Sequence, residues 1–137
     1  PVRSPGQVIV FDIVFLISLI NWAGAKRTCE DLHGHLVKIE TEEENEELYN
    51  EAVRLNMTEV PSWIGLSDTA EEGTWVWTDG ERVNFTNWSQ YQPDNHANNE
   101  DCADLRTAAG CDPHRSNTWN DVNCNSAIRA IICELNV

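Results

Sequence analysis

The spread of the cysteines constrains the fold of this chain more than any other feature. Five of them occur in 137 residues, at positions 29, 102, 111, 124 and 133. None forms a Cys-x-x-Cys pair, so neither a zinc ribbon nor a thioredoxin-type redox pair is indicated. Widely spaced cysteines in a small acidic chain are typical of disulfides formed outside the cytosol. Three glycosylation sequons, which begin at Asn56, Asn84 and Asn87, point the same way. We therefore predict a secreted or extracellular protein.

The charge balance excludes one class of partner. The formal net charge is −14, with 23 Asp and Glu residues against 9 Lys and Arg residues. Nucleic acid binding requires basic side chains for the phosphates, so no nucleic acid partner is predicted. The acidic excess fits either a solvated surface or carboxylates gathered around a hard cation. Six tryptophans supply large apolar areas, which favour a single compact domain.

Hydrophobic periodicity predicts two helices in the first half of the chain. Trp22, Ala25 and Cys29 recur at helical spacing and give a short first helix one apolar face. Thr41 followed by Glu44 is a capping box that opens the second helix. The buried stripe predicted for this second helix consists of Leu48, Ala52, Val53 and Leu55.

Short strand-like segments follow the helical patterns and are separated by turn residues. The predicted strands are residues 36–39, 63–66, 74–77 and 127–133. Residues 84–120 are rich in Asn, Asp, Gly and Pro, and a loop of this length in a compact domain is usually functional or disordered. The predicted fold class is α+β, with two helices and a mostly antiparallel sheet interrupted by one large polar loop region.

Residues 1–20 are interpreted as an apolar N-terminal segment ahead of a domain at residues 21–137. The apolar run Val8–Ile20 contains Asp12 and Ser18 and is shorter than the ~20 residues that span a bilayer. Its β-branched residues favour a buried strand, and the alternative is the remnant of a signal peptide.

Three polar clusters in the loop region carry the candidate chemistry. Ca²⁺ binds about six to eight oxygens from carboxylate and amide groups of the kind found there. A bridge between Cys102 and Cys124, which flank the second and third clusters, would fasten the loop to the sheet. The clusters are Gln92-Pro93-Asp94, Asn99-Glu100-Asp101-Cys102 and Trp119-Asn120-Asp121.

Between about residues 22 and 134 the chain resembles the C-type lectin-like domain. Six motifs in the family's order carry the resemblance: Trp22-x-x-Ala25-x-x-x-Cys29, Trp63-Ile64-Gly65-Leu66, Gln92-Pro93-Asp94, Glu100-Asp101-Cys102, Trp119-Asn120-Asp121 and Ile132-Cys133-Glu134. The resemblance implies the family's fold, with two helices, small antiparallel sheets and a long Ca²⁺-binding loop region. It also implies a cis peptide before Pro93 and disulfides that join Cys29 to Cys133 and Cys102 to Cys124.

The resemblance further implies a principal Ca²⁺ site at which a sugar binds the ion directly. Its implied ligands are Gln92, Asp94, Glu100, Asn120 and Asp121. Two sugar hydroxyls would donate to the carboxylates of Asp94 and Glu100 and accept from the amides of Gln92 and Asn120. The Gln-Pro-Asp order favours galactose or N-acetylgalactosamine over mannose, so glycans that end in these sugars are the expected partners. Galactose binders of the family tend to carry a Trp two residues after the Asp, and His96 stands there, where it is expected to stack on the sugar or hydrogen-bond to it.

A second, auxiliary Ca²⁺ site is suggested by Asp68, Glu72 and Asp101, which match family positions near the base of the loop. Asn95 stands where a carboxylate is common in the family. The alternative interpretation is that Asp68 and Glu72 are polar turn residues.

Two functions are open on these grounds. One is a Ca²⁺-dependent lectin for glycan recognition or innate defence, and the other is a non-sugar interaction or structural module of the kind that binds matrix, mineral or ice. No enzyme is predicted, because the sequence has no Gly-x-Ser-x-Gly motif and no phosphate-cradling loop. Cys111 has no partner in the family pattern, so it is expected to be a free thiol or to link two chains as a homodimer.

Overall fold

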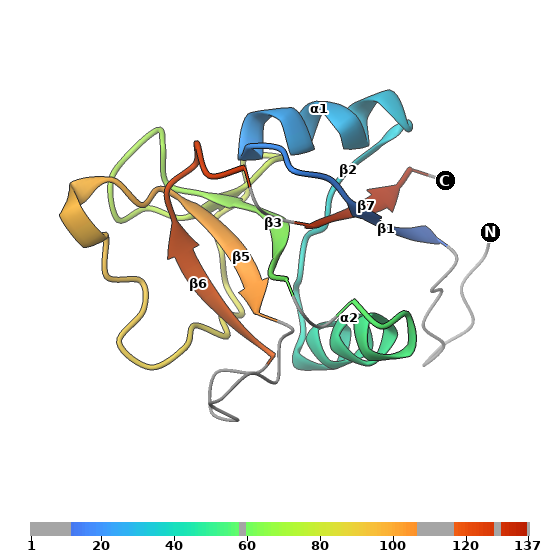
Figure 1. The fold of residues 1–137 in the computed structure, drawn as a ribbon. Helices are drawn as coiled ribbons and strands as arrows, with labels where there is room; N and C mark the ends of the chain where they lie inside the picture. Colours follow the sequence, from blue (N-terminus) through green and yellow to red (C-terminus); the bar gives the residue numbers. More distant parts are fainter. Residues whose placement is uncertain (1–11, 58–59, 107–116, 128–129, 137) are drawn as a thin grey trace.

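The structure of the chain is a computed structural model that describes residues 12–57, 60–106, 117–127 and 130–136. Two helices, α1 (Trp22–Asp31) and α2 (Glu42–Arg54), lie on opposite sides of a central sheet (Figure 1). The yellow and orange part of the chain, between β4 and β5, forms long loops at the end of the molecule away from β1. This is the α+β arrangement that the sequence predicts.

All named strands belong to one sheet. Their order is β1-β7-β3-β5-β6, with β2 paired to β7 and β4 paired to β3. The neighbours β3 and β7 run parallel, and every other pair of strands is antiparallel. The strands are β1 (Ile13–Ile17), β2 (Gly34–Leu36), β3 (Ser62–Ser67), β4 (Val76–Trp77), β5 (Cys102–Arg106), β6 (Thr118–Val122) and β7 (Ala130–Leu135).

All four predicted strands have different bounds in the structure, although residues 63–66 lie wholly within β3. The strand predicted at residues 36–39 ends at Leu36, although Val37 and Ile39 remain buried. Only Val76 and Trp77 of residues 74–77 pair with β3, and the last strand begins three residues later than predicted, at Ala130. Apolar content correctly predicted burial of Val37, Ile39 and the two tryptophans at positions 75 and 77, whereas Ala127 is exposed. The hydrogen-bond register depends on which neighbouring strand is in reach.

Both helices begin at side-chain caps. The Asn21 side chain accepts a hydrogen bond from the Gly24 backbone N–H at 2.9 Å at the start of α1. The Thr41 hydroxyl accepts one from the Glu44 N–H at 3.1 Å, and the Glu44 carboxylate accepts from the Glu40 N–H at 3.0 Å. The capping interaction predicted for the second helix is therefore present, with Glu40 as the donor to the Glu side chain.

The predicted buried stripe of α2 is wrong at two positions. Leu48 and Ala52 are buried, but Val53 is 46% and Leu55 is 40% exposed. Val53 follows Ala52 by about 100° around the helix, which turns it away from the sheet. Leu55 is the C-cap residue, beyond the last full turn.

Trp119 on β6 is the centre of the largest apolar cluster. It is 0% exposed and makes edge-to-face contacts with Trp77, Phe85 and Trp88 at centroid separations of 5.7, 5.8 and 5.7 Å. Such contacts stabilise by about 0.5–1.5 kcal/mol each beyond the area they bury. They hold β4 and the first part of the loop region against β6.

Two disulfides join elements that are distant in sequence, and both are the pairs implied by the family resemblance. Cys29 on α1 is bonded to Cys133 on β7, across 104 residues of sequence. Cys102 at the start of β5 is bonded to Cys124 just after β6, and so closes the loop region at its base. Cys111 lies outside the described residues. In the part of the chain that is described, none of the helices is long and apolar enough to span a bilayer.

A buried amide on α2 ties this helix to the sheet. Asn45 is 1% exposed, and its Nδ2 donates to Asn117 Oδ1 at 2.6 Å and to the Asn117 carbonyl at 3.1 Å. Its Oδ1 accepts from Trp119 Nε1 at 2.7 Å. The side chain thus satisfies the one polar group of the tryptophan at the centre of the core.

Replacing Asn45 by Ala should lower the free energy of unfolding by about 2–3 kcal/mol, because the indole N–H of Trp119 would stay buried without its acceptor. Urea denaturation followed by tryptophan fluorescence measures this change. Glu46→Ala, an exposed position on the same helix, should change stability by no more than about 0.5 kcal/mol. Equal stability of the two variants would contradict the assignment.

Candidate functional site

Two groups of carboxylates gather where the loop region meets β5 and β6. The principal cluster consists of Asp94, Glu100 and Asp121, and the second cluster of Asp68, Glu72 and Asp101. In each cluster, one carboxylate oxygen from every member lies within 4.8 Å of the others. The structure therefore places the six acidic residues named from the sequence in two groups of three, which match the two predicted sites.

Asp121 organises the principal cluster. It lies on β6, is 0% exposed, and accepts hydrogen bonds from the backbone N–H groups of Asp94 at 3.1 Å and Asn95 at 2.7 Å. The His96 N–H is shared between Asp94 Oδ1 at 3.3 Å and Glu100 Oε1 at 3.2 Å. The Asn95 side chain accepts from the Glu100 N–H at 3.1 Å. Backbone amides thus hold the loop so that its carboxylates converge.

The two predicted amide ligands lie beside this cluster. The Gln92–Pro93 peptide is cis, and Gln92 Nε2 donates to Asp94 Oδ2 at 3.4 Å. Gln92 Oε1 is buried, and the described part of the chain offers it no hydrogen-bond donor. Asn120 Nδ2 donates to the Asp121 carbonyl at 3.0 Å. A buried acceptor without a donor costs about 1–3 kcal/mol, so Gln92 Oε1 is suited to a cation as its partner.

Proximity and burial shift the acidities in the principal cluster. Burial, together with the neighbouring carboxylates, raises the pKa of Glu100 to about 7. A hydrogen bond from Glu100 holds the pKa of Asp94 below its usual value. Burial raises the pKa of Asp121, although the backbone N–H groups of the loop oppose this shift. Near neutral pH the cluster therefore retains a proton that a cation would displace.

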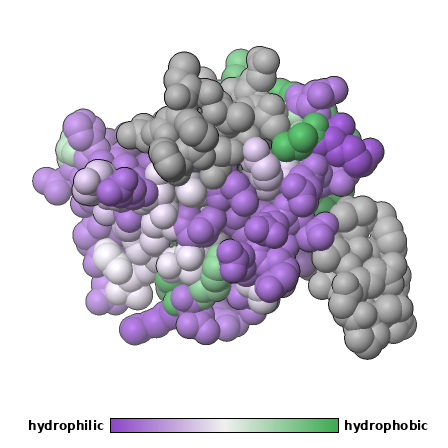
Figure 2. All heavy atoms as spheres, turned by 90° about the horizontal axis from the view of Figure 1, so that it is seen from below, coloured by the Kyte–Doolittle hydropathy of each residue, from purple (hydrophilic) through white to green (hydrophobic). Residues whose placement is uncertain are grey.

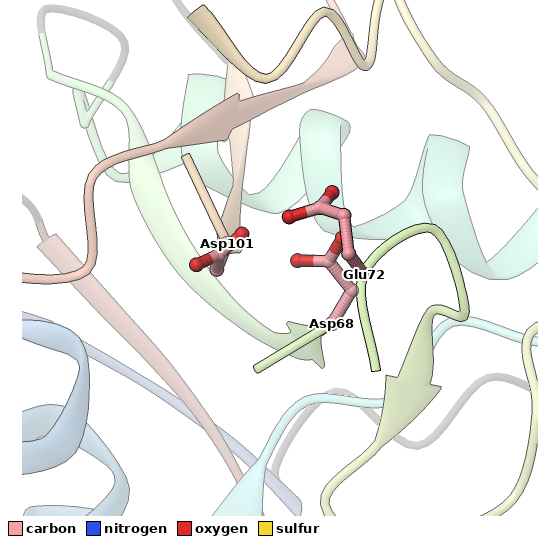
Figure 3. Close-up of side chains that lie close together, drawn as sticks. All are labelled: Asp68, Glu72 and Asp101. Carbon is pink, nitrogen blue, oxygen red and sulfur yellow. The ribbon is translucent and has the colours of Figure 1, made fainter. Parts of the chain in front are cut away.

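The second cluster has a similar excess of acceptors. Asp68 follows β3 and is 1% exposed, and its Oδ2 accepts from the Gly73 N–H at 2.9 Å. Asp68 and Glu72 direct their carboxylates toward Asp101 (Figure 3). One buried oxygen each of Asp68 and Asp101 finds no hydrogen-bond donor among the described residues. Burial raises the pKa of Asp68 to about 7, so this cluster also carries less negative charge than its composition suggests.

Two further residues belong to the surface of the loop. His96, the predicted sugar contact, is exposed. Tyr91, which the sequence reasoning passed over, is 84% exposed and has a left-handed backbone with φ of 68°. An aromatic residue directly before Gln92 was the feature that could have drawn attention to it. Elsewhere the described surface is mostly hydrophilic on the face drawn in Figure 2.

Known proteins match both the sequence and the fold. A family model described as the Lectin C-type domain matches residues 18–135. An alpha-N-acetylgalactosamine-specific lectin from Patiria pectinifera is 44% identical over 104 residues, which are 74% of this chain and 58% of the lectin. The low affinity immunoglobulin epsilon Fc receptor of Mus musculus is 36% identical over 114 residues, 83% of this chain and 30% of the receptor. The chain thus spans less than two thirds of each of these relatives.

A solved structure extends the match over nearly the whole chain. It is the mouse scavenger receptor C-type lectin carbohydrate-recognition domain, with a TM-score of 0.76 and 33% sequence identity. The superposition covers 97% of this chain and 98% of that domain.

In the presence of a chelator, the protein should become less stable as pH rises from about 5 to 8. Glu100 has a raised pKa in the folded state, so folding favours its protonated form, and this contribution is lost between its unfolded pKa and about 7. His35, whose pKa is raised by its hydrogen bond to Glu134, shifts stability in the same direction. Glu100→Gln should therefore reduce the pH dependence of the melting temperature without abolishing it. An identical pH profile for this variant would contradict the acidity assigned to Glu100.

Proposed function

The chain belongs to the C-type lectin domain family, and from this we propose that it binds carbohydrate in a Ca²⁺-dependent manner at the principal cluster. The observation that carries the proposal is the convergence of three carboxylates within 4.8 Å beside the buried, donor-free oxygen of Gln92. This donor set is hard, anionic and only partly hydrogen-bonded, which suits Ca²⁺.

Five side chains would hold the ion. Asp94, Glu100 and Asp121 supply carboxylate oxygens, and Gln92 and Asn120 supply amide oxygens. Asp121 has a second role, because its hydrogen bonds to two loop N–H groups position Asp94 for binding. When bound, Ca²⁺ offers coordination positions to two neighbouring hydroxyls of a sugar.

The same side chains would recognise the sugar by hydrogen bonds. A hydroxyl donates to an ionised carboxylate of Asp94 or Glu100 and accepts from an amide N–H of Gln92 or Asn120. The amide at position 92 and the carboxylate at position 94 favour galactose or N-acetylgalactosamine over mannose. The name of the relative from Patiria pectinifera, an alpha-N-acetylgalactosamine-specific lectin, supports this choice.

The second cluster is proposed as a site for an auxiliary Ca²⁺, with Asp68, Glu72 and Asp101 as ligands. The two buried carboxylate oxygens without hydrogen-bond donors support this assignment. Asp101 directly follows Glu100 in the chain, so a cation there would stiffen the base of the sugar-binding loop. Its role would be structural, because these residues are not among those proposed to bind the sugar.

The proposed lectin acts outside the cell, where its glycan partners and its disulfides both occur. A link between two copies through Cys111 would raise the avidity of two weak sugar sites.

The protein should be retained on immobilised galactose in Ca²⁺, retained less on mannose, and released by a chelator. Asp94→Ala should lower Ca²⁺ affinity by about 100-fold or more and abolish retention, because it removes a direct ligand. Calorimetric titration with CaCl₂ measures the first effect. Asp31→Ala, which removes an exposed carboxylate at the end of α1, is the matched control and should behave like the unmodified protein.

Three other results would change the assignment. Stronger retention on mannose would contradict the sugar preference while keeping the lectin. No retention of folded, Ca²⁺-binding protein on either sugar would instead favour the non-sugar interaction module. Unchanged Ca²⁺ affinity of Asp94→Ala would contradict the proposed ion site itself.

Tyr91 is proposed to stack on the apolar face of the bound sugar, in the absence of a Trp at position 96. Tyr91→Gly should weaken galactose binding about tenfold, the effect expected from losing one aromatic contact. Its stability should be unchanged or higher, because glycine adopts the φ of 68° without strain. Tyr91→Phe should bind like the unmodified protein. Equal affinity of the Gly and Phe variants, measured by titration, would exclude the stacking role.

A further inference from the structure

Two glycosylation sequons follow one another directly in the loop between β4 and β5, and their surroundings differ. Asn84-Phe85-Thr86 is followed at once by Asn87-Trp88-Ser89. We propose that Asn84 is a site of N-linked glycosylation and that Asn87 is not. The proposal concerns a modification separate from the sugar-binding site and rests on passage through a secretory pathway that carries out this reaction.

The first sequon is open to solvent at both positions that the modification requires. Asn84 and Thr86 are exposed, while Phe85 between them is partly buried and packs against the main core beside Trp119. This alternation anchors the backbone and leaves the side chains of Asn84 and Thr86 at the surface. A shallow hollow of about 70 Å³, lined in part by Asn84, Phe85 and Trp77, adjoins the site. The first sugar of a glycan thus has free space beside a hollow that Lys38, Glu81 and Arg82 also line.

The second sequon is built into the fold. Asn87 Nδ2 donates to the Asn117 carbonyl at 2.6 Å, and the Asn87 carbonyl accepts from the Trp119 N–H at 2.9 Å. Ser89 is 8% exposed, and its N–H donates to the Trp119 carbonyl at 2.8 Å. A glycan on Nδ2 of Asn87 would have to enter the space between this loop and β6. Folded, secreted protein is therefore expected to carry an unmodified Asn87.

The reaction assigned to Asn84 needs an activated donor, which is an oligosaccharide attached to a lipid pyrophosphate. The Asn84 Nδ2 forms a bond to C1 of the first sugar as the bond from C1 to the pyrophosphate breaks. The amide loses one of its two protons, and the lipid pyrophosphate leaves with the bonding electron pair. The Thr86 hydroxyl completes the recognition sequence.

The test uses the full chain secreted from an insect cell line, followed by treatment with a peptide N-glycosidase and mass spectrometry. The enzyme converts a glycan-carrying asparagine to aspartate, so the peptide that contains both residues reports which was modified. We expect conversion at Asn84 alone. Asn84→Gln and Thr86→Ala should each abolish the conversion in this peptide. Asn87→Gln should retain it and should also lower thermal stability, because the hydrogen bond to Asn117 is lost.

Two results would overturn the proposal. One is conversion at Asn87 in folded, monodisperse protein. The other is an unmodified Asn84 in the secreted product. Neither result depends on sugar binding, so the proposed lectin function is tested separately.

Discussion

The buried carboxylate of Asp121 is the contact on which the arrangement of the loop region depends. It lies on β6, two residues after Trp119. It accepts hydrogen bonds from the backbone N–H groups of Asp94 at 3.1 Å and Asn95 at 2.7 Å. A carboxylate buried in this way is stable only with such donors or a cation. The same strand thus contributes the central aromatic side chain of the core and the carboxylate that shapes the site. A packing change around Trp119 that shifts β6 would therefore also shift the Asp121 carboxylate and the loop bonded to it.

Part of the acidic excess of the chain is gathered where the loop region meets β5 and β6. Six carboxylates form two clusters, and they have fewer hydrogen-bond donors than acceptors. Burial and mutual repulsion raise the pKa values of Glu100 and Asp68 to about 7. Other acidic residues are paired instead. The Nζ atom of Lys38, for example, lies 2.8 Å from Oδ2 of Asp79 and 2.7 Å from Oε2 of Glu81. The two clusters are therefore places where a divalent cation would stabilise the ionised carboxylates.

The family resemblance suggested Asp68 and Glu72 of the second cluster. Residue patterns predicted the two helices, the cap of the second one, the aromatic strand at residues 63–66 and the three polar clusters of the loop region. They succeeded because caps, periodicity and carboxylate-rich loops are local features. The disulfide pairs and the cis peptide before Pro93 came from the family resemblance, since spacing does not specify them. Asn45 could not be predicted, because an amide in the middle of an acidic helix reads as a surface residue until its partners Asn117 and Trp119, more than 70 residues away, are known. Val53 was misplaced because an apolar residue beside a buried one need not share its face.

The antiparallel pairing of β1 with β7 determines where further polypeptide can be attached to this domain. The first and last strands of the fold are neighbours, and both lie at the end of the sheet away from the loop region (Figure 1). Polypeptide that enters and leaves through these two strands does so at one pole, with the loops at the opposite pole. Such a unit can be mounted on a stalk or repeated along a longer protein without steric conflict at the loops. In an array of this kind every copy would point its loops outward, away from the common support.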